Sequence, residues 1–190
     1  MLKNLQELVL RISRTWWLYI LVLLAFAGSL VALLRIGEQF PRHAGGVAPF
    51  DLQNGLKSGD VYPQIANYTE QARQLYYAFT AIDYLFPLFA GLFISATVAF
   101  ALRNSLPAAY DALVERRLLL LLMVPTGFDW LENIAAISSI AAWPDGPAWL
   151  PVLLVTAKKL KLGCMLLGQA VMALSLLLAA VTWLGRRFRN

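Results

Sequence analysis

The sequence has 190 residues, of which 59% are hydrophobic and 14% charged, and its mean hydropathy is +0.63. Soluble domains carry about 25% charged residues, so this composition indicates a membrane protein and excludes an ordinary soluble domain. The formal net charge of +5 does not indicate a nucleic-acid partner, because the basic residues lie at the ends of apolar segments. The single cysteine, Cys164, excludes an intramolecular disulfide.

Four apolar segments are long enough to cross a bilayer. They predict an all-α fold, a bundle of four transmembrane helices, in one integral membrane domain over residues 1–190. The predicted spans are residues 15–34, 76–102, 118–141 and 149–184. Ahead of the first span, the N-terminal residues up to Arg14 place apolar side chains at helical spacing, which favours a helix lying at the membrane surface.

Residues 36–75 form the longest polar segment and predict an outer loop between the first two spans. Proline and glycine recur through this segment, so we expect an ordered loop without long regular elements. Thr69 is expected to cap a helix that begins at Glu70 and continues into the second span.

The basic residues also predict an orientation. They concentrate near both termini and in the link at residues 103–117, whereas the outer loop carries fewer over a greater length. The positive-inside rule then places both termini in the cytoplasm and the loop outside, in a bacterial inner (plasma) membrane.

The third predicted span carries Asp129, Glu132 and Asn133 near its centre. A carboxylate at the centre of a bilayer costs at least ~2.5–3.5 kcal/mol, so it requires a partner or water. The three residues are separated by one, three or four positions, which places them on one face of a helix. This face is the candidate site.

The fourth span supplies the expected positive partner. A tight turn at residues 143–147 makes the third and fourth spans antiparallel neighbours, so Lys158 or Lys159 is expected to reach the carboxylates. Thr156, Lys159 and Gly163 form a polar stripe of helical spacing. The alternative is that the lysines form an exposed outer turn and the carboxylates have another partner.

In the second span, Asp83 precedes Pro87 by four residues, and proline cannot donate a hydrogen bond to the carbonyl group of Asp83. At ~1.5 Å per residue, Asp83 is expected about 30 Å above Arg103, at the outer interface. The same arithmetic places Asp129 about 16 Å above Leu118, near the midplane.

Two segments, YAFTAIDYLFPLF at residues 77–89 and FDWLEN at residues 128–133, resemble an uncharacterised family of small four-span membrane proteins. The family pattern is D-x-x-x-P in the second span, D-x-x-E-N in the third and T-x-x-K in the fourth. Here the corresponding residues are Asp83 with Pro87, Asp129 with Glu132 and Asn133, and Thr156 with Lys159. The resemblance covers the last three spans; it implies the topology and these site residues but no reaction.

The sequence thus predicts a ligand-binding site in a buried polar cluster facing the outer half of the bilayer. Its members are Asp83, Asp129, Glu132, Asn133, Thr156 and Lys159. We expect an accessory or ligand-binding subunit that contacts a membrane lipid, a quinone-like molecule or a partner protein, as a homo-oligomer or within a larger membrane complex. No cofactor or metal is expected, because the only histidine, His43, lies in a glycine-rich loop.

Three other interpretations of the same cluster remain open. It could be a structural ion-pair network that holds the bundle together. It could belong to a membrane-embedded enzyme acting on a lipid-like substrate, with Asp129 or Glu132 as the general acid or base and Lys159 stabilising charge. It could also serve a proton- or ion-coupled carrier whose carboxylates titrate during transport.

Overall fold

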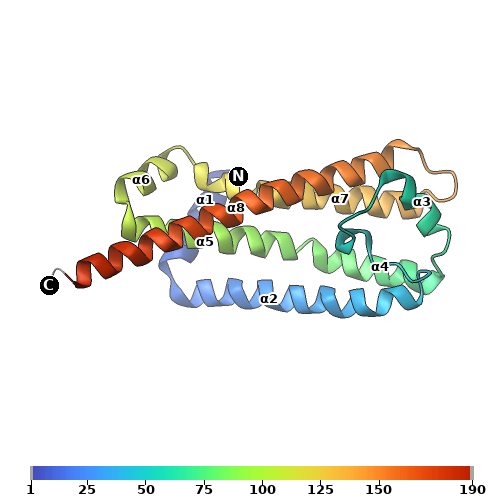
Figure 1. Cartoon of the computed structure of the whole chain (residues 1–190), viewed down its shortest axis with the longest axis horizontal. Coiled ribbons are helices and arrows are strands. Elements are labelled where there is room, and N and C mark those ends of the chain that lie inside the picture. The colour runs from blue at the N-terminus through green and yellow to red at the C-terminus, as the bar shows by residue number, and fades with distance from the viewer. Residues whose placement is uncertain (1, 189–190) are drawn as a thin grey trace.

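The computed structural model describes residues 2–188, which fold into helices and loops without a β-strand in that range (Figure 1). The α-helices are α1 (Leu2–Arg14), α2 (Trp16–Gln39), α3 (Ser58–Ile65), α4 (Glu70–Asp83), α5 (Phe86–Ser105), α6 (Pro107–Glu115), α7 (Val124–Ala141) and α8 (Trp149–Arg187). Three 3-10 helices join them: η1 (Phe40–Arg42), η2 (Phe50–Leu52) and η3 (Leu118–Met123).

Four helical stretches are long and apolar enough to cross a membrane. They are Trp16–Arg42, Glu70–Ser105, Leu118–Ala141 and Trp149–Arg187. The predicted all-α four-helix bundle is therefore confirmed, and the chain is an integral membrane protein. The first and second spans are longer toward the outer loop than the sequence predicted, whereas the third matches its predicted range.

Helix α5 is the central element of the bundle. It contacts α1, α2, α7 and α8, while α7 and α8 share the most extensive helix interface. Half of the most apolar window of the second span is buried, compared with 11% in the first and in the fourth spans. The first and fourth spans therefore present most of their apolar side chains outward, as lipid-facing helices do.

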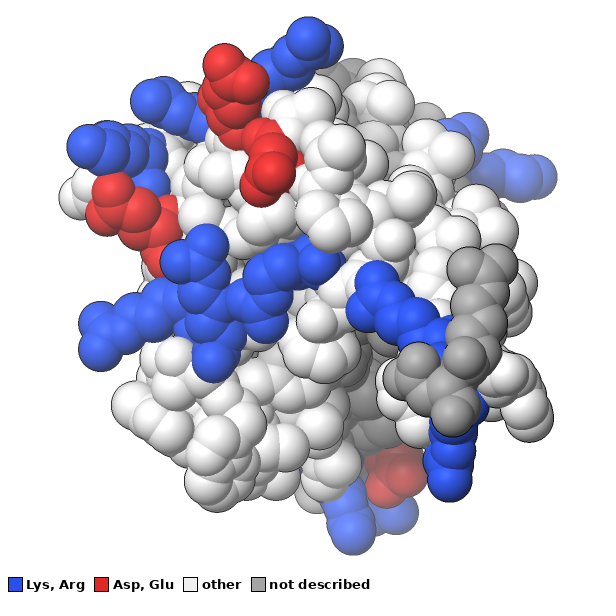
Figure 2. Space-filling model, turned by 90° about the vertical axis from the view of Figure 1, so that its left-hand side faces the viewer, with Lys and Arg blue, Asp and Glu red and all other residues white. Residues whose placement is uncertain are grey.

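The two ends of the molecule differ in construction. Figure 1 shows α1, α6 and the end of α8 at one end, and the outer loop with α3 at the other. We call these the terminal end and the loop end. Basic side chains outnumber acidic ones on the face of the terminal end (Figure 2).

The loop end has a core like that of a soluble domain. Phe40, Phe50 and Tyr68 of the loop pack with Tyr76 of α4, with ring centroids 5.2–6.5 Å apart. Burial raises the pKa of the Tyr68 phenol above its usual range, so this ring remains neutral within the core. Thr69 caps α4 as predicted, because its side chain accepts a hydrogen bond from the Ala72 amide.

The second span is interrupted between α4 and α5, at the position where the sequence places Pro87. Helix α7 contacts the backbone on both sides of this break. Trp130 Nε1 donates to the Tyr84 carbonyl at 2.9 Å, and Thr126 Oγ1 donates to the Pro87 carbonyl at 2.8 Å. The third span is thereby fixed against the break in the second.

The link at residues 103–117 is mostly helical, because α6 occupies most of it. The chain after α6 turns back along α5, and Ser95 Oγ donates to the Leu119 carbonyl at 3.3 Å. Ser95 precedes Arg103 by eight residues. The third span therefore begins beside a point of α5 that lies about 12 Å closer to the N-terminal end of this helix than Arg103 does. This offset changes the depth of everything that follows in the third span.

Candidate functional site

Lys158 and Lys161 point into the bundle, and Lys159 does not. Lys158 and Lys161 are 3% and 4% exposed and lie on the face of α8 that also buries Leu150 and Leu154. Lys159 is exposed, and so is Thr156. The structure therefore does not bring Thr156 and Lys159 into the cluster, since helical periodicity turns both away from the α7 interface.

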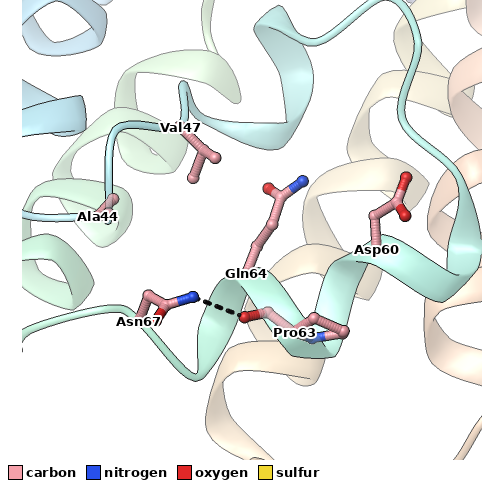
Figure 3. Close-up of a pocket in the computed structure, with 7 residues that line it drawn as sticks. Ala44, Val47, Asp60, Pro63, Gln64 and Asn67 are labelled. Atoms are coloured by element: carbon pink, nitrogen blue, oxygen red, sulfur yellow. Dashed lines mark hydrogen bonds between the residues drawn. The ribbon is translucent and has the colours of Figure 1, made fainter.

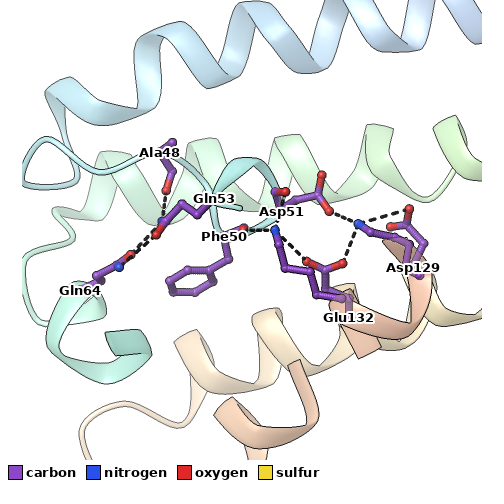
Figure 4. Close-up of polar contacts among 9 residues, drawn as sticks. Ala48, Phe50, Asp51, Gln53, Gln64, Asp129 and Glu132 are labelled. Atoms are coloured by element: carbon purple, nitrogen blue, oxygen red, sulfur yellow. Dashed lines mark hydrogen bonds and ion pairs between the residues drawn. The ribbon is translucent and has the colours of Figure 1, made fainter. Parts of the chain in front are cut away.

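Lys161 lies among three carboxylates (Figure 4). Its Nζ atom forms an ion pair with Asp51 Oδ1, lies 2.6 Å from Glu132 Oε2 and lies 3.5 Å from Asp129 Oδ2. Three elements meet at this ammonium group, because Asp51 belongs to η2 in the outer loop, the other two acids to α7, and Lys161 to α8.

Lys158 fixes the outer loop to the bundle. Its Nζ atom donates to the carbonyl groups of Phe50 and Asp51, both at 2.6 Å, and lies 3.7 Å from Glu132 Oε1. An ammonium group has three donors, and these contacts offer a partner for each. The role of Lys158 follows from this geometry: it holds η2 against α7 and α8.

Asp83 and Asn133 complete the cluster from α4 and α7. Both are buried, Asn133 lies beside the Asp83 carboxyl group, and Asp83 is within electrostatic reach of Asp51 and Lys161. The expected separation in depth between Asp83 and Asp129 is therefore wrong. That expectation requires the second and third spans to meet the cytoplasmic boundary at the same level. In the structure, α6 separates the two spans, and the third begins beside Ser95 and not beside Arg103.

The cluster contains more carboxyl groups than lysines. Asp51, Asp83, Asp129 and Glu132 face the two ammonium groups of Lys158 and Lys161. Five side-chain atoms of the cluster have no hydrogen-bond partner in the described chain: Asp83 Oδ2, Asp129 Oδ1, Asn133 Nδ2 and both carboxylate oxygens of Glu132. The Glu132 oxygens have lysine ammonium groups at 3.7 and 2.6 Å, whereas the other three atoms have no such contact. Buried polar atoms in this condition are uncommon and indicate a ligand, a proton or water.

An apolar cavity of about 130 Å³ lies beside the cluster. Four spans contribute to its wall, and the apolar part is Phe26, Phe86, Pro87, Ala90, Gly91, Ile94, Leu122, Pro125, Met165 and Gly168. Its polar groups are Thr126, Asp129 and Gln169. Because Thr126 already donates to the Pro87 carbonyl, Asp129 is the buried ionisable group that this cavity reaches.

Three carboxylates, those of Asp51, Asp129 and Glu132, have oxygen atoms within 4.8 Å of one another. Three such oxygens are a familiar arrangement for a hard cation. Here the ammonium group of Lys161 forms ion pairs with all three, which gives them a positive partner without a metal ion.

A second hollow, of about 300 Å³, lies within the outer loop (Figure 3). Ala44, Val47, Asp60, Gln64 and Asn67 line it, and their side chains are polar or small. Gln64 is already paired with Gln53 through two hydrogen bonds of 2.9 and 3.1 Å. The hollow is thus formed where the loop folds onto itself.

Sequence reasoning missed Asp51, Lys161 and Gln169 as site residues. The position of Lys161 has a signal in the sequence, because Leu150, Leu154, Lys158 and Lys161 follow one helical face. Asp51 has no such signal, since it lies in an irregular loop. Gln169 occupies one of many outward positions on α8 and is also not indicated by a pattern.

Comparisons with models of protein families, with curated proteins and with solved structures found no match for this chain. The fold and the site define its class on their own. It is an all-α integral membrane protein with a buried carboxylate–lysine cluster at the loop end and an apolar cavity that reaches one of the carboxylates.

Proposed function

We propose that this protein is an accessory or ligand-binding subunit that holds one lipid-like, amphipathic molecule in the cavity beside Asp129. The observation that carries the proposal is the position of Asp129, whose side chain lines the apolar cavity and whose Oδ1 atom lacks a partner. A hydroxyl, amide or amine group of a ligand would satisfy this oxygen, while the apolar part of the ligand would fill the cavity.

The volume limits the part of the ligand that is enclosed. Pockets for drug-sized ligands measure about 300–1,000 Å³, which is more than the 130 Å³ here. The cavity therefore suits a single acyl or isoprenoid segment, or one small ring, with the remainder of the molecule in the bilayer.

A purely structural role explains only part of the cluster. Lys158 and Lys161 provide partners for Glu132 and for the loop residue Asp51, and they fix the loop to the bundle. They leave Asp129 Oδ1 without a partner. The proposal assigns the lysine contacts to stability and the cavity side of Asp129 to binding.

The test compares two glycines of α8. Gly168 lines the cavity, and a Cβ atom there would meet only Leu122 at 3.9 Å, so Gly168→Leu places its side chain into the cavity. Gly163 is exposed, with nothing within 4 Å of its Cβ position, so Gly163→Leu is the matched control. Mass spectrometry of the purified proteins measures which lipid-like molecules remain bound.

We expect the native chain and Gly163→Leu to retain the same molecule, and Gly168→Leu to lose it. Asp129→Asn should weaken retention while leaving the cavity open. Equal retention by all four proteins would contradict the proposal. If the native chain, but not Asp129→Asn, chemically converts the bound molecule, this would instead favour an enzyme that uses Asp129 as an acid or base.

A proton-coupled carrier is the second candidate, and the excess of carboxyl groups favours it. Four carboxyl groups and two lysines leave two negative charges to be neutralised, and protons are one means of doing so. Proton uptake into liposomes that contain the protein, abolished by Asp129→Asn, would support the carrier. An absence of uptake would leave the binding subunit as the proposal.

We further propose that both termini face the cytoplasm of a bacterial inner membrane. The basic face of the terminal end supports this orientation (Figure 2). The test uses a Cys164→Ser background with a single cysteine at an exposed position, Asn54→Cys in the loop or Asp111→Cys in α6. A membrane-impermeant maleimide should label the first in intact spheroplasts and the second only after lysis; the reverse would contradict the orientation.

A further inference from the structure

A further cavity of the membrane helices lies at the terminal end. It measures about 400 Å³ and lies where α1 and α2 join, against α5 and α8. Its apolar wall includes Trp16, Ile20, Phe100 and Leu176. Trp16 is 79% exposed and lies at the first position of α2, as expected for a side chain at the membrane interface.

Two arginines, Arg14 and Arg103, stand at this cavity. Arg14 Nη2 donates to the Tyr110 hydroxyl at 3.1 Å. Arg103 Nη2 donates to the Ser13 carbonyl at 3.3 Å, and its guanidinium lies 5.9 Å from the centre of the Phe100 ring. Each guanidinium is therefore oriented by the protein while most of its five donors remain free.

Neither Arg14 nor Arg103 forms an ion pair with an acidic side chain in residues 2–188. The two positive charges are thus not neutralised at the cavity by the described chain. Arginine pairs with phosphate through two parallel hydrogen bonds, and an oriented guanidinium with free donors is suited to that geometry.

We propose that this cavity binds one anionic phospholipid of the inner leaflet. The phosphodiester group contacts Arg14 and Arg103, and an acyl chain lies along Ile20, Phe100 and Leu176. Two unneutralised guanidinium groups beside an apolar floor favour this occupant. A zwitterionic phospholipid brings a cationic group beside its phosphate and so adds no net negative charge, and a free phosphate would leave the apolar wall exposed.

This inference is independent of the ligand at Asp129, because the two cavities share no lining residue. The binding depends on the chemistry of the terminal end, and the assignment to the inner leaflet rests on the proposed orientation of the termini. The anionic phospholipid also supplies a reason for the bend between α1 and α2 at Thr15, since that bend places Arg14 and Trp16 at the same cavity.

The experiment is native mass spectrometry of the full chain with equal amounts of phosphatidylglycerol and phosphatidylcholine. We expect one phosphatidylglycerol to be retained in preference to phosphatidylcholine. Replacing both arginines, Arg14→Gln with Arg103→Gln, should weaken this preference roughly 30-fold, as expected for two interfacial charges. The matched control, Lys3→Gln with Arg11→Gln, removes two exposed charges from α1 and should leave the preference unchanged.

Two further variants keep the test decisive if the double replacement does not fold. Arg14→Gln alone removes one charge and a single hydrogen bond to Tyr110, and it should lower the preference by a smaller factor. Arg14→Lys with Arg103→Lys retains both charges and should keep the preference within a few-fold. Equal retention of both lipids by the native chain, or an equal loss in the Lys3 and Arg11 control, would overturn the proposal.

Discussion

Lys161 is the residue on which the buried cluster depends most. It lies within ion-pair distance of Asp51, Asp129 and Glu132, so its ammonium group is shared by three carboxylates. Lys158 has a different role, because two of its three contacts are to backbone carbonyl groups of the outer loop. On the same face of α8, Lys161 therefore balances the charge of the carboxylates, and Lys158 mainly holds the outer loop.

We predict that Lys161→Met lowers the free energy of unfolding by about 3–5 kcal/mol, because removing one partner of a buried ion pair leaves the other charged and unpaired. Lys159→Met is the matched control and should change it by less than about 0.5 kcal/mol, because Lys159 is exposed on the same helix. Denaturant unfolding in detergent micelles measures both. Similar losses in the two variants would show that the ion pairs contribute little.

At this scale the sequence predicted the acidic half of the site better than the basic half. Asp129, Glu132 and Asn133 are charged or polar residues within an apolar span, and the structure buries all three. Lys159 is exposed and not part of the cluster, because the buried face of α8 follows Leu150, Leu154, Lys158 and Lys161. Asp51 could not be predicted, since its position depends on how η2 folds onto the bundle.

At the scale of the elements, the outer loop covers the loop end of the bundle. Its aromatic core, the Lys158 contacts to η2 and the contact of α3 with the turn before α8 all hold it in place. In α3, Tyr62 donates from its hydroxyl group to the Pro147 carbonyl at 2.9 Å, directly beside Gly146.

We predict that Gly146→Ala loosens this loop. A Cβ atom at residue 146 would overlap the hydroxyl oxygen of Tyr62 and lie 2.7 Å from its Cζ atom, so the ring must move. The expected loss of stability is about 1–3 kcal/mol, as for other overpacked contacts. Limited proteolysis of the loop should become faster.

The control for this prediction is Gly55→Ala, since nothing lies within 4 Å of a Cβ atom there. Adding Tyr62→Ala to Gly146→Ala should relieve the overlap and slow proteolysis again. If Gly146→Ala is cut no faster than Gly55→Ala, α3 does not depend on this contact.

The sequence predicts where the four spans lie along the chain better than it predicts how deep each span sits relative to the others. Hydropathy and length are sufficient to locate four spans, because a bilayer requires long apolar helices. They do not show that α6 carries the chain back before η3 begins beside Ser95. That offset shifts the third span toward the N-terminal end of α5. It brings Asp129 to the level of the break near Pro87.

In the molecule as a whole, the loop end and the terminal end are packed differently. The loop end has the largest buried core and the ion-pair cluster, whereas the terminal end has smaller cores, a basic face and the cavity beside Arg14 and Arg103.

The most direct test of this account is a structure of the protein in a lipid bilayer, at a resolution that shows bound molecules. The account predicts elongated non-protein density in the cavity lined by Phe26, Ala90 and Gly168, with a polar end in hydrogen-bonding distance of Asp129 Oδ1. A cavity filled by protein side chains, with Asp129 fully paired to Lys161, would contradict it and leave the cluster with a structural role alone.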